Sequence, residues 1–296
     1  MAEDSRDTEN GGSAHPAEES VAPGARAADA GADPVAPGMR IDIVHERPAE
    51  DAPRGGPVRI GWLLKSEAGG VLYDPPERVR SADVNRAHAK SASRCPAVIN
   101  LESRFFAVKC PFDLHLGFTR DREGKPALRN LAGAASPIRT AKINQKITLV
   151  AEKEWRYPDR PTIQLRLPYI FLADEPVWMS QVAPFMHLPS KPWPGTLFGG
   201  RMPIHLWPRP LMWAFEWHDT KAELVLKRGE PLFYCMFETI PPDRAVQMVE
   251  VERTPELERY IEFIGGAVNY VNQTFSLFEA AERARPTRLV EPRRRD

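Results

Sequence analysis

The chain has 296 residues, and its 40 Lys and Arg balance its 40 Asp and Glu at a formal net charge of zero. Hydrophobic residues make up 42% of the sequence, which suffices for a packed core, and 30 residues are proline. Because proline interrupts helices and central strands, we expect short strands, many loops and few long helices.

The N-terminal segment 1–56 carries 12 acids and 5 arginines and almost no large apolar side chains. Such a composition predicts a disordered acidic tail, in which only residues 39–44 alternate like an edge strand or a partner-binding segment. The segment contains no apolar signal sequence, and nowhere do 18 apolar residues follow one another. Together with three cysteines that lack CxxC spacing, this predicts a cytoplasmic protein without membrane insertion.

Residues 57–282 are expected to form a single globular domain in which short β-prone runs recur every 8 to 15 residues. Strands are predicted over 59–64, 97–101, 104–109, 112–118, 143–150, 162–172, 211–217, 222–226 and 232–238. A short surface helix is predicted over 82–92, a polar loop over 119–140, a proline-rich loop over 184–210, and a hairpin between 211–217 and 222–226. This spacing favours a mainly β (α+β) fold, either an antiparallel β-sandwich or a jelly-roll-like barrel.

One amphipathic helix is predicted over 255–282, at the end of the domain. Thr254 is a favourable N-cap, Pro255 suits the first helical position, and Gly265 and Gly266 weaken the middle of the helix. The last segment, 283–296, holds six arginines and is expected to be a solvated basic tail. Two alternatives are contact with phosphates or acidic lipid, and folding back on the acidic N-terminal tail.

The sequence contains no Walker loop, no GxGxxG after a strand, no GxSxG and no HExxH. These absences argue against nucleotide hydrolases, dinucleotide dehydrogenases, α/β-hydrolases and zincins. One candidate pair of metal ligands lies outside these motifs: Glu216 and His218 would lie on the same face of a strand. A third ligand, His187, His205 or His115, would complete a two-histidine, one-carboxylate site for Fe²⁺ or another divalent metal. Alternatively, Glu216 and His218 lie on a solvated face beside a turn.

Five of the seven tryptophans fall between Trp178 and Trp217, among prolines. On rigid loops, Trp193 and Trp207, with Arg201, Arg209 and Lys191 nearby, would form a surface that stacks on an extended ligand. The competing interpretation, which we favour, is that the tryptophans pack the core and hold the loop on the sheet.

Cys110, Asp113 and His115 also suggest a nucleophile and its base. Cysteine is among the most buried residue types, so we expect a structural role for Cys110, and likewise for Cys95 before Pro96.

Three short motifs carry a resemblance to known sequences: Cys95-Pro96-Ala97-Val98, Pro111-Phe112-Asp113 and Arg228-Gly229-Glu230-Pro231-Leu232. In these the chain resembles uncharacterised proteins of bacteria and their phages. The resemblance implies a shared domain and no particular activity.

Two functions therefore stay open. The first is a non-enzymatic binding or assembly module without a cofactor, whose Trp- and Pro-rich surface recognises a protein or an extended ligand. The second is a metal-dependent jelly-roll enzyme of the iron oxygenase kind, using Glu216 and His218. Nucleic acid ranks third as a partner, because no basic face can be read from the domain sequence.

Overall fold

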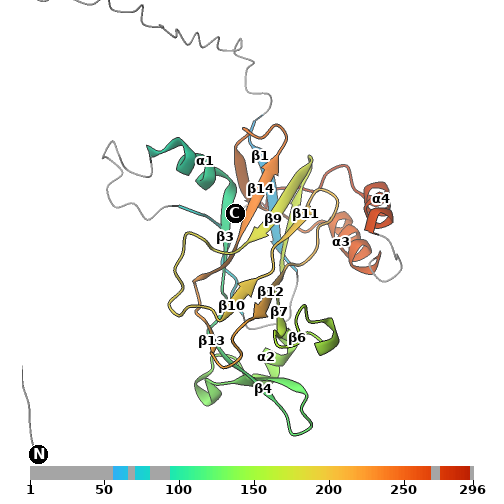
Figure 1. The fold of residues 1–296 in the computed structure, drawn as a ribbon. Helices are drawn as coiled ribbons and strands as arrows, with labels where there is room; N and C mark the ends of the chain where they lie inside the picture. Colours follow the sequence, from blue (N-terminus) through green and yellow to red (C-terminus); the bar gives the residue numbers. More distant parts are fainter. Residues whose placement is uncertain (1–55, 66–70, 81–93, 268–273, 294–296) are drawn as a thin grey trace, which may run out of the picture. The chain divides into compact units, whose positions relative to one another are not determined.

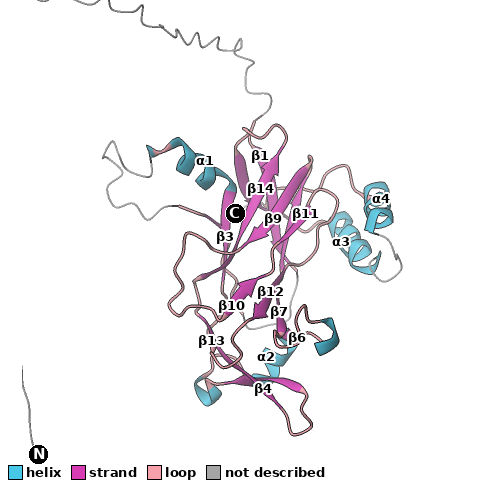
Figure 2. Cartoon of the chain, viewed as in Figure 1, coloured by secondary structure: helices cyan, strands magenta, loops and turns pink. Residues whose placement is uncertain are grey.

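The computed structural model describes residues 56–65, 71–80, 94–267 and 274–293. The tail predicted over 1–56, its strand-like segment 39–44 and the helix predicted over 82–92 lie outside the described residues, except for Gly56. Within the described ranges the chain is mainly β (Figure 2), as the sequence predicts.

The strands of the described residues form four sheets (Figure 1), named here by one strand of each. The β1 sheet has the order β15 (Val246–Glu250), β1 (Val58–Leu64), β8 (Tyr169–Ala173). The β14 sheet has the order β11 (Gly200–Pro203), β9 (Val177–Val182), β14 (Pro231–Thr239), β3 (Phe105–Lys109), β2 (Glu77–Arg78). The β12 sheet has the order β10 (Gly195–Leu197), β12 (Met212–Trp217), β7 (Thr162–Arg166), β6 (Ile147–Leu149). The β4 sheet has the order β13 (Leu224–Leu226), β4 (Leu114–Arg120), β5 (Pro126–Asn130).

Neighbouring strands of these sheets are antiparallel, apart from the parallel pair β1 and β15. None of the four sheets, as the described residues form them, closes on itself. The mainly β fold with open antiparallel sheets therefore fits the predicted sandwich, and the predicted barrel is not formed.

The helices are short and separated along the chain (Figure 2). They are α1 (Pro96–Arg104), α2 (Thr140–Lys146), α3 (Pro255–Ala267) and α4 (Thr274–Ala284), with single 3₁₀ turns η2 (Gly133–Ala135) and η3 (Glu152–Glu154). In the part of the chain that is described, none of these helices combines the length and the hydrophobicity that crossing a bilayer requires.

A first hydrophobic core joins the inner faces of all four sheets. Alternate residues supply it, as the period of two in a strand dictates: Ile60 from β1, Phe171 from β8, Phe215 from β12, Phe233 from β14 and Leu116 from β4 are all buried in it. Burial of such side chains contributes about 1.5–3 kcal/mol each, so this cluster dominates the stability of the domain.

A second core lies on the opposite face of the β1 sheet. There Leu63 and the β8 residues Ile170 and Leu172 pack against Leu257 and Ile264 of α3. The predicted helix start is confirmed, because the Thr254 hydroxyl accepts a hydrogen bond from the Leu257 amide at 3.2 Å. Over the predicted helix 255–282 the structure describes two helices, α3 and α4 (Figure 1), with residues 268–273 between them outside the described part. Leu277 and Phe278, expected to continue the apolar face in a second segment, pack against the second core from α4.

The C-terminal segment belongs to this second core as far as it is described. Leu289 and Val290 are buried, and their amides donate to Asp174 Oδ1. Arg285 donates to the carbonyls of His205 and Asp174 at 2.7 and 2.5 Å. Residues 285–293 are therefore part of the fold and not the solvated tail predicted over 283–296, because the two apolar residues draw the arginines onto the domain.

The strand predicted over 97–101 is wrong, since these residues lie in α1. Pro96 occupies the first helical position, for which its fixed φ is suited, and the Ile99 amide donates to the Cys95 carbonyl at 2.9 Å. No residue of α1 is buried. The β-branched Val98 and Ile99 therefore lack the packed sheet face that normally gives such residues their strand preference.

Other differences come from strand pairing. The predicted hairpin of 211–217 with 222–226 is wrong, because β12 pairs with β10 and β7 while β13 pairs with β4. The predicted loop 119–140 contains β5, which pairs with β4 around a turn at Gly124. Residues 143–146 of the predicted strand 143–150 belong to helix α2, and the predicted strand 162–172 divides into β7 and β8. The predicted loop 184–210 holds β10 and β11, and β9 and β15 were not predicted.

Candidate functional site: a buried carboxylate on the β12 sheet

The outer face of the β12 sheet carries a buried acid. Trp213, Phe215 and Trp217 alternate into the first core, which places Glu216 on the other face. Its cross-strand neighbours there are Thr196 of β10 and Thr162 of β7. Glu216 is only 3% exposed, an uncommon position for a carboxylate unless it is paired or bound.

The Glu216 carboxylate contacts two polar side chains, His218 and Arg160, and Thr196 joins this cluster through His218. Oε1 of Glu216 lies 2.9 Å from Nε2 of His218, so the predicted proximity of these two residues is confirmed. The same Nε2 lies 3.2 Å from the Thr196 hydroxyl. Nη1 of Arg160 lies 3.8 Å from Oε1, close enough for an ion pair and too far for a hydrogen bond.

The second carboxylate oxygen of Glu216 distinguishes this site. Oε2 is buried and has no hydrogen-bond partner. A buried polar atom without a partner costs about 1–3 kcal/mol, and more when it carries charge. Since folded proteins satisfy most such atoms, an exception calls for a bound water, a bound ion or a functional role.

Glycine at position 195 allows the close approach of β10 that brings Thr196 to the pair. A Cβ atom added there would lie 1.9 Å from the Glu216 carbonyl oxygen. The preceding carbonyl, of Pro194, accepts from the amides of His218 and Asp219 at 2.8 and 3.1 Å. The Pro194-Gly195 step therefore fixes both the Thr196 hydroxyl and the backbone that carries His218.

Arg160 is positioned by a tight turn before β7. Tyr157 and Arg160 form an isolated antiparallel bridge, with the Arg160 amide 3.1 Å from the Tyr157 carbonyl. The guanidinium carbon stands 4.3 Å from the centre of the Tyr157 ring, a cation–π arrangement that limits side-chain freedom. Sequence reasoning missed Arg160 and Thr196, and only the Pro-Gly step hinted at the local geometry.

The donor atoms at this site have the spacing of metal ligands. Two ligands about 2.1 Å from one ion lie about 3.0 Å apart in octahedral and about 3.4 Å apart in tetrahedral geometry. The separations of 2.9 Å and 3.2 Å from His218 Nε2 lie close to this range and are also those of ordinary hydrogen bonds. Within the described residues no group of three His, Cys, Asp or Glu side chains gathers for a metal, so a metal at this pair would need Thr196 as a third protein donor.

The structure does not bring His187, His205 or His115 to Glu216 and His218 as the predicted third ligand. His205 Nδ1 lies 3.1 Å from the Val177 carbonyl, and burial lowers its pKa. His187 lies on the loop after β9, where its Nε2 is buried without a hydrogen-bond partner. His115 lies on β4, whereas His187 and His205 lie in the segments that follow β9 and β11.

His115 belongs to a second carboxylate–imidazole pair, on the β4 sheet. Its Nε2 lies 2.8 Å from Glu223 Oε2, which also accepts from Lys191 at 2.9 Å. These two hydrogen bonds lower the pKa of Glu223. Cys110 is buried, as predicted, and burial raises its thiol pKa to about 12, so no thiolate nucleophile is available beside Asp113 and His115 at neutral pH.

The predicted ligand surface of Trp193, Trp207, Arg201 and Arg209 does not gather in one place. Trp207 packs in the second core against Phe278, and Trp193 lies edge-on to Trp213 with ring centres 5.6 Å apart. Arg201 pairs with Glu238 at 2.6 Å on the β14 sheet and covers the Trp178 ring at 4.2 Å, and Arg209 is half-buried. Of the five tryptophans between Trp178 and Trp217, three are buried, as the interpretation as core residues predicts: Trp207, Trp213 and Trp217.

The beginning of the proline-rich segment exposes large apolar side chains. Phe185 and Leu188 are 55% and 86% exposed. Phe185 packs edge-on against Phe105 and Tyr234, with ring centres 5.3 and 5.4 Å apart. These contacts hold the loop on the outer face of the β14 sheet.

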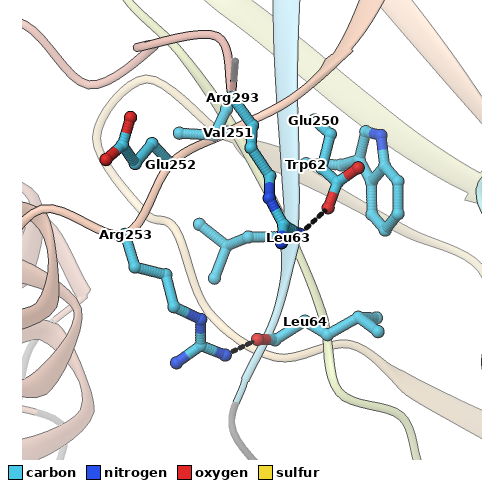
Figure 3. A pocket seen from close by; sticks show the side chains of 8 residues that line it. All are labelled: Trp62, Leu63, Leu64, Glu250, Val251, Glu252, Arg253 and Arg293. Carbon is cyan, nitrogen blue, oxygen red and sulfur yellow. Dashed lines mark hydrogen bonds and ion pairs between the residues drawn. The ribbon is translucent and has the colours of Figure 1, made fainter. Parts of the chain in front are cut away.

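A pocket of about 430 Å³ opens elsewhere, between the ends of β1 and β15 (Figure 3). Its floor is apolar, from Leu63 and Val251, and two guanidinium groups line it. Arg293 is paired with Glu250 at 2.6 Å, and Arg253 donates to the Leu64 carbonyl (Figure 3). Both cations are thus already engaged, and none of the residues predicted for a site lines this pocket.

Comparison of the chain with protein-family models, with curated proteins and with solved structures gave no match. The resemblance to uncharacterised bacterial and phage proteins stays a prediction.

Proposed function

We propose that the domain is a metal-dependent binding module, in which Glu216 and His218 hold a divalent transition-metal ion and Thr196 completes the protein donors. The observation that carries the proposal is the buried Glu216 carboxylate with one oxygen unsatisfied. A metal ion bound by this carboxylate would offset the cost of burying its charge.

The donor set favours ions such as Mn²⁺, Fe²⁺, Co²⁺ or Zn²⁺. Imidazole nitrogen suits zinc, iron, copper and nickel, while carboxylate and hydroxyl oxygens suit harder ions such as manganese. The His218 side chain is 39% exposed, so coordination positions on that side face solvent. A bound ion would therefore present open positions to a ligand, as catalytic metal sites do and closed structural sites do not.

The test is calorimetric titration of the full chain, purified without a histidine tag, with Mn²⁺, Co²⁺ and Zn²⁺. We expect one ion per chain in the wild type. Glu216→Gln and His218→Ala should each weaken binding by more than about 100-fold, the upper limit for loss of a mere outer-shell partner.

His115→Ala is the matched control, because it breaks the other carboxylate–imidazole pair and leaves the proposed donors in place. Its affinity should equal that of the wild type. Absence of binding to the wild type, or equal loss in His115→Ala and His218→Ala, would refute the proposal.

An enzymatic role is the second candidate, favoured by the same exposure of His218. It requires that the open metal positions activate a substrate and not only hold a ligand. The iron oxygenase chemistry expected from the sequence used two histidines, and the proposed centre has one. Turnover that disappears in both Glu216→Gln and His218→Ala, but not in His115→Ala, would favour the enzyme.

A further inference from the structure

Another pocket, of about 470 Å³, lies on the outer face of the β14 sheet, between α1 and β14. Figure 1 shows α1 beside the ends of β3 and β14. Alternate residues of β14 enter the first core, so Met236 and Glu238 point outward, where both line the pocket. Asn100 and Arg104, one helical turn apart, line it from α1, and Asp243 lines it from the segment after β14. A pocket of this volume suits a small molecule.

One part of this pocket is apolar. Met236 stands opposite Phe105 of β3 in the sheet, on the same outward face. The ring of Phe105 packs edge-on against Phe185, with ring centres 5.3 Å apart, and Phe185 remains 55% exposed. An apolar strip of three side chains therefore begins inside the pocket and continues beyond it, and covering it with the apolar side chain of a ligand is favourable.

The two carboxylates of the pocket differ in their partners. Glu238 accepts hydrogen bonds from Arg201 at 2.6 Å and from Ser180 at 3.4 Å, so its charge is already matched. Asp243 is exposed, and among the described residues its carboxylate makes no hydrogen bond and no ion pair. Asp243 is therefore available to a positively charged group of a ligand.

The guanidinium of Arg104 is the cation of the pocket, and it also lacks a charged partner. Within the described part of the chain it donates to neutral oxygens alone: the carbonyls of Phe237 and Arg244, both at 3.4 Å, and the Thr239 hydroxyl at 3.2 Å. These distances exceed the usual length of a hydrogen bond to a carboxylate. One cation and one carboxylate thus line the same pocket without an ion pair between them.

We infer that this pocket binds a free α-amino acid with a large apolar side chain. Arg104 holds the α-carboxylate, because hydrogen bonds between guanidinium and carboxylate are stronger than those to neutral oxygens. Asp243 holds the α-ammonium group, and the side chain of the ligand lies along Met236 and Phe105. An anion is repelled by Asp243 and a cation by Arg104, so the two charges together select a zwitterion. The inference does not depend on the metal ion proposed at Glu216, which belongs to another sheet.

The experiment titrates the full chain calorimetrically with L-phenylalanine at about pH 6, below the pKa of an α-amino group. N-acetyl-L-phenylalanine lacks the ammonium group and L-phenylalaninamide lacks the carboxylate. Each should bind at least about tenfold more weakly than L-phenylalanine, the lower end for loss of a hydrogen bond to a charged group. Glycine keeps both charges without the side chain and should also bind about tenfold more weakly. In protein with ¹³C-methyl-labelled methionine, the NMR signal of Met236, assigned with Met236→Leu, should shift when L-phenylalanine is added.

Two variants should change the preference among these compounds. In Arg104→Gln, L-phenylalanine should bind at least about tenfold more weakly, while L-phenylalaninamide binds more tightly than it does to the wild type, because a repelling charge is gone. In Asp243→Asn, N-acetyl-L-phenylalanine should gain affinity for the corresponding reason. A variant that merely fails to fold gains affinity for neither compound. Arg129→Gln removes an exposed arginine of β5 and, as the control, should bind every compound as the wild type does.

Several results would overturn the inference. It is wrong if L-phenylalanine does not bind, or binds without shifting the Met236 signal. Equal affinity for the three phenylalanine compounds would contradict the selection of a zwitterion, and equal affinity for glycine would contradict the apolar side chain. A loss in Arg129→Gln as large as that in Arg104→Gln would show that the pocket is not the site.

Discussion

Glu216 with His218 and Glu223 with His115 are two carboxylate–imidazole pairs of nearly equal length, 2.9 and 2.8 Å. Their surroundings differ. The Glu216 side chain is 4% exposed and the Glu223 side chain is 45% exposed. Glu223 has Lys191 as an additional cation in direct contact at 2.9 Å, whereas Glu216 keeps one oxygen without a partner.

The comparison shows that the same two residue types serve different purposes at different depths. Exposed ion pairs contribute little to stability, because water and salt screen them. A buried carboxylate carries a desolvation cost that a single imidazole and a distant guanidinium offset only in part. A buried carboxylate with one oxygen unpartnered carries a cost that binding sites often bear and that purely structural pairs avoid.

The largest expected effect comes from a substitution that prevents β10 from lying close to β12. Only the Glu216–His218 pair depends on this close approach. Gly195→Ala places a Cβ against the Glu216 carbonyl, and overpacking of this kind costs about 1–3 kcal/mol, with a clash against backbone at the upper end. We expect a loss of about 3 kcal/mol in chemical denaturation, together with weaker metal binding. Gly200→Ala, where a Cβ meets nothing within 4 Å, should leave both quantities unchanged; equal effects at the two glycines would contradict this account of β10.

Glu216→Gln sharpens the comparison by removing charge from the buried pair. In metal-free protein with chelator, we expect the free energy of unfolding to rise by about 1 kcal/mol, because the uncompensated charge disappears while the shape is kept. Urea denaturation measures this change. A decrease of more than about 2 kcal/mol would show that Glu216 is a structural anchor, as expected when a well-satisfied buried pair is broken.

A substitution at His205 tests how burial of an imidazole affects stability when no carboxylate is in contact with it. Desolvation lowers its pKa from 6.5, and the charge of Arg285 lowers it further. The unfolded chain then binds more protons, so stability is complete above the unfolded pKa and declines as the pH falls below about 6.5. Between pH 7.5 and 5.5, the thermal midpoint of His205→Gln should decline less than that of the wild type. Identical slopes would remove His205 as a cause.

The smallest effect is expected at the exposed pair. Hydrogen bonds from Lys191 and His115 lower the pKa of Glu223 below 4.5, so its stabilisation is present at neutral pH and is lost as the pH falls through the folded-state value. Because the group is solvated, Glu223→Gln should barely change the thermal midpoint at pH 7, and added salt should abolish even that change. A large, salt-independent loss would erase the distinction between the two pairs.

Much of the fold follows from local patterns that the sequence displays. The alternation in Trp213-Ala214-Phe215-Glu216-Trp217 predicts β12 and both of its faces, and Thr254-Pro255 predicts the start of α3. The prediction failed where local preference and tertiary packing disagree, as in α1, whose β-branched residues have no sheet to join. It also failed for strand partners: β12 pairs with β10 and β7, and β13 pairs with β4, which a local sequence pattern does not specify.

The sequence by itself determined that Glu216 lies opposite the aromatic side chains and near His218, because a period of two is a local property of an extended chain. Only the tertiary structure decided that Glu216 is buried, that Arg160 lies beside it and Thr196 beside His218, and that His187 and His205 lie elsewhere. The contacts of Thr196 and Arg160 join residues 22 and 56 positions apart along the chain. They depend on the order of strands in the sheet and on one close backbone approach at Gly195, and no periodicity in the chain encodes either.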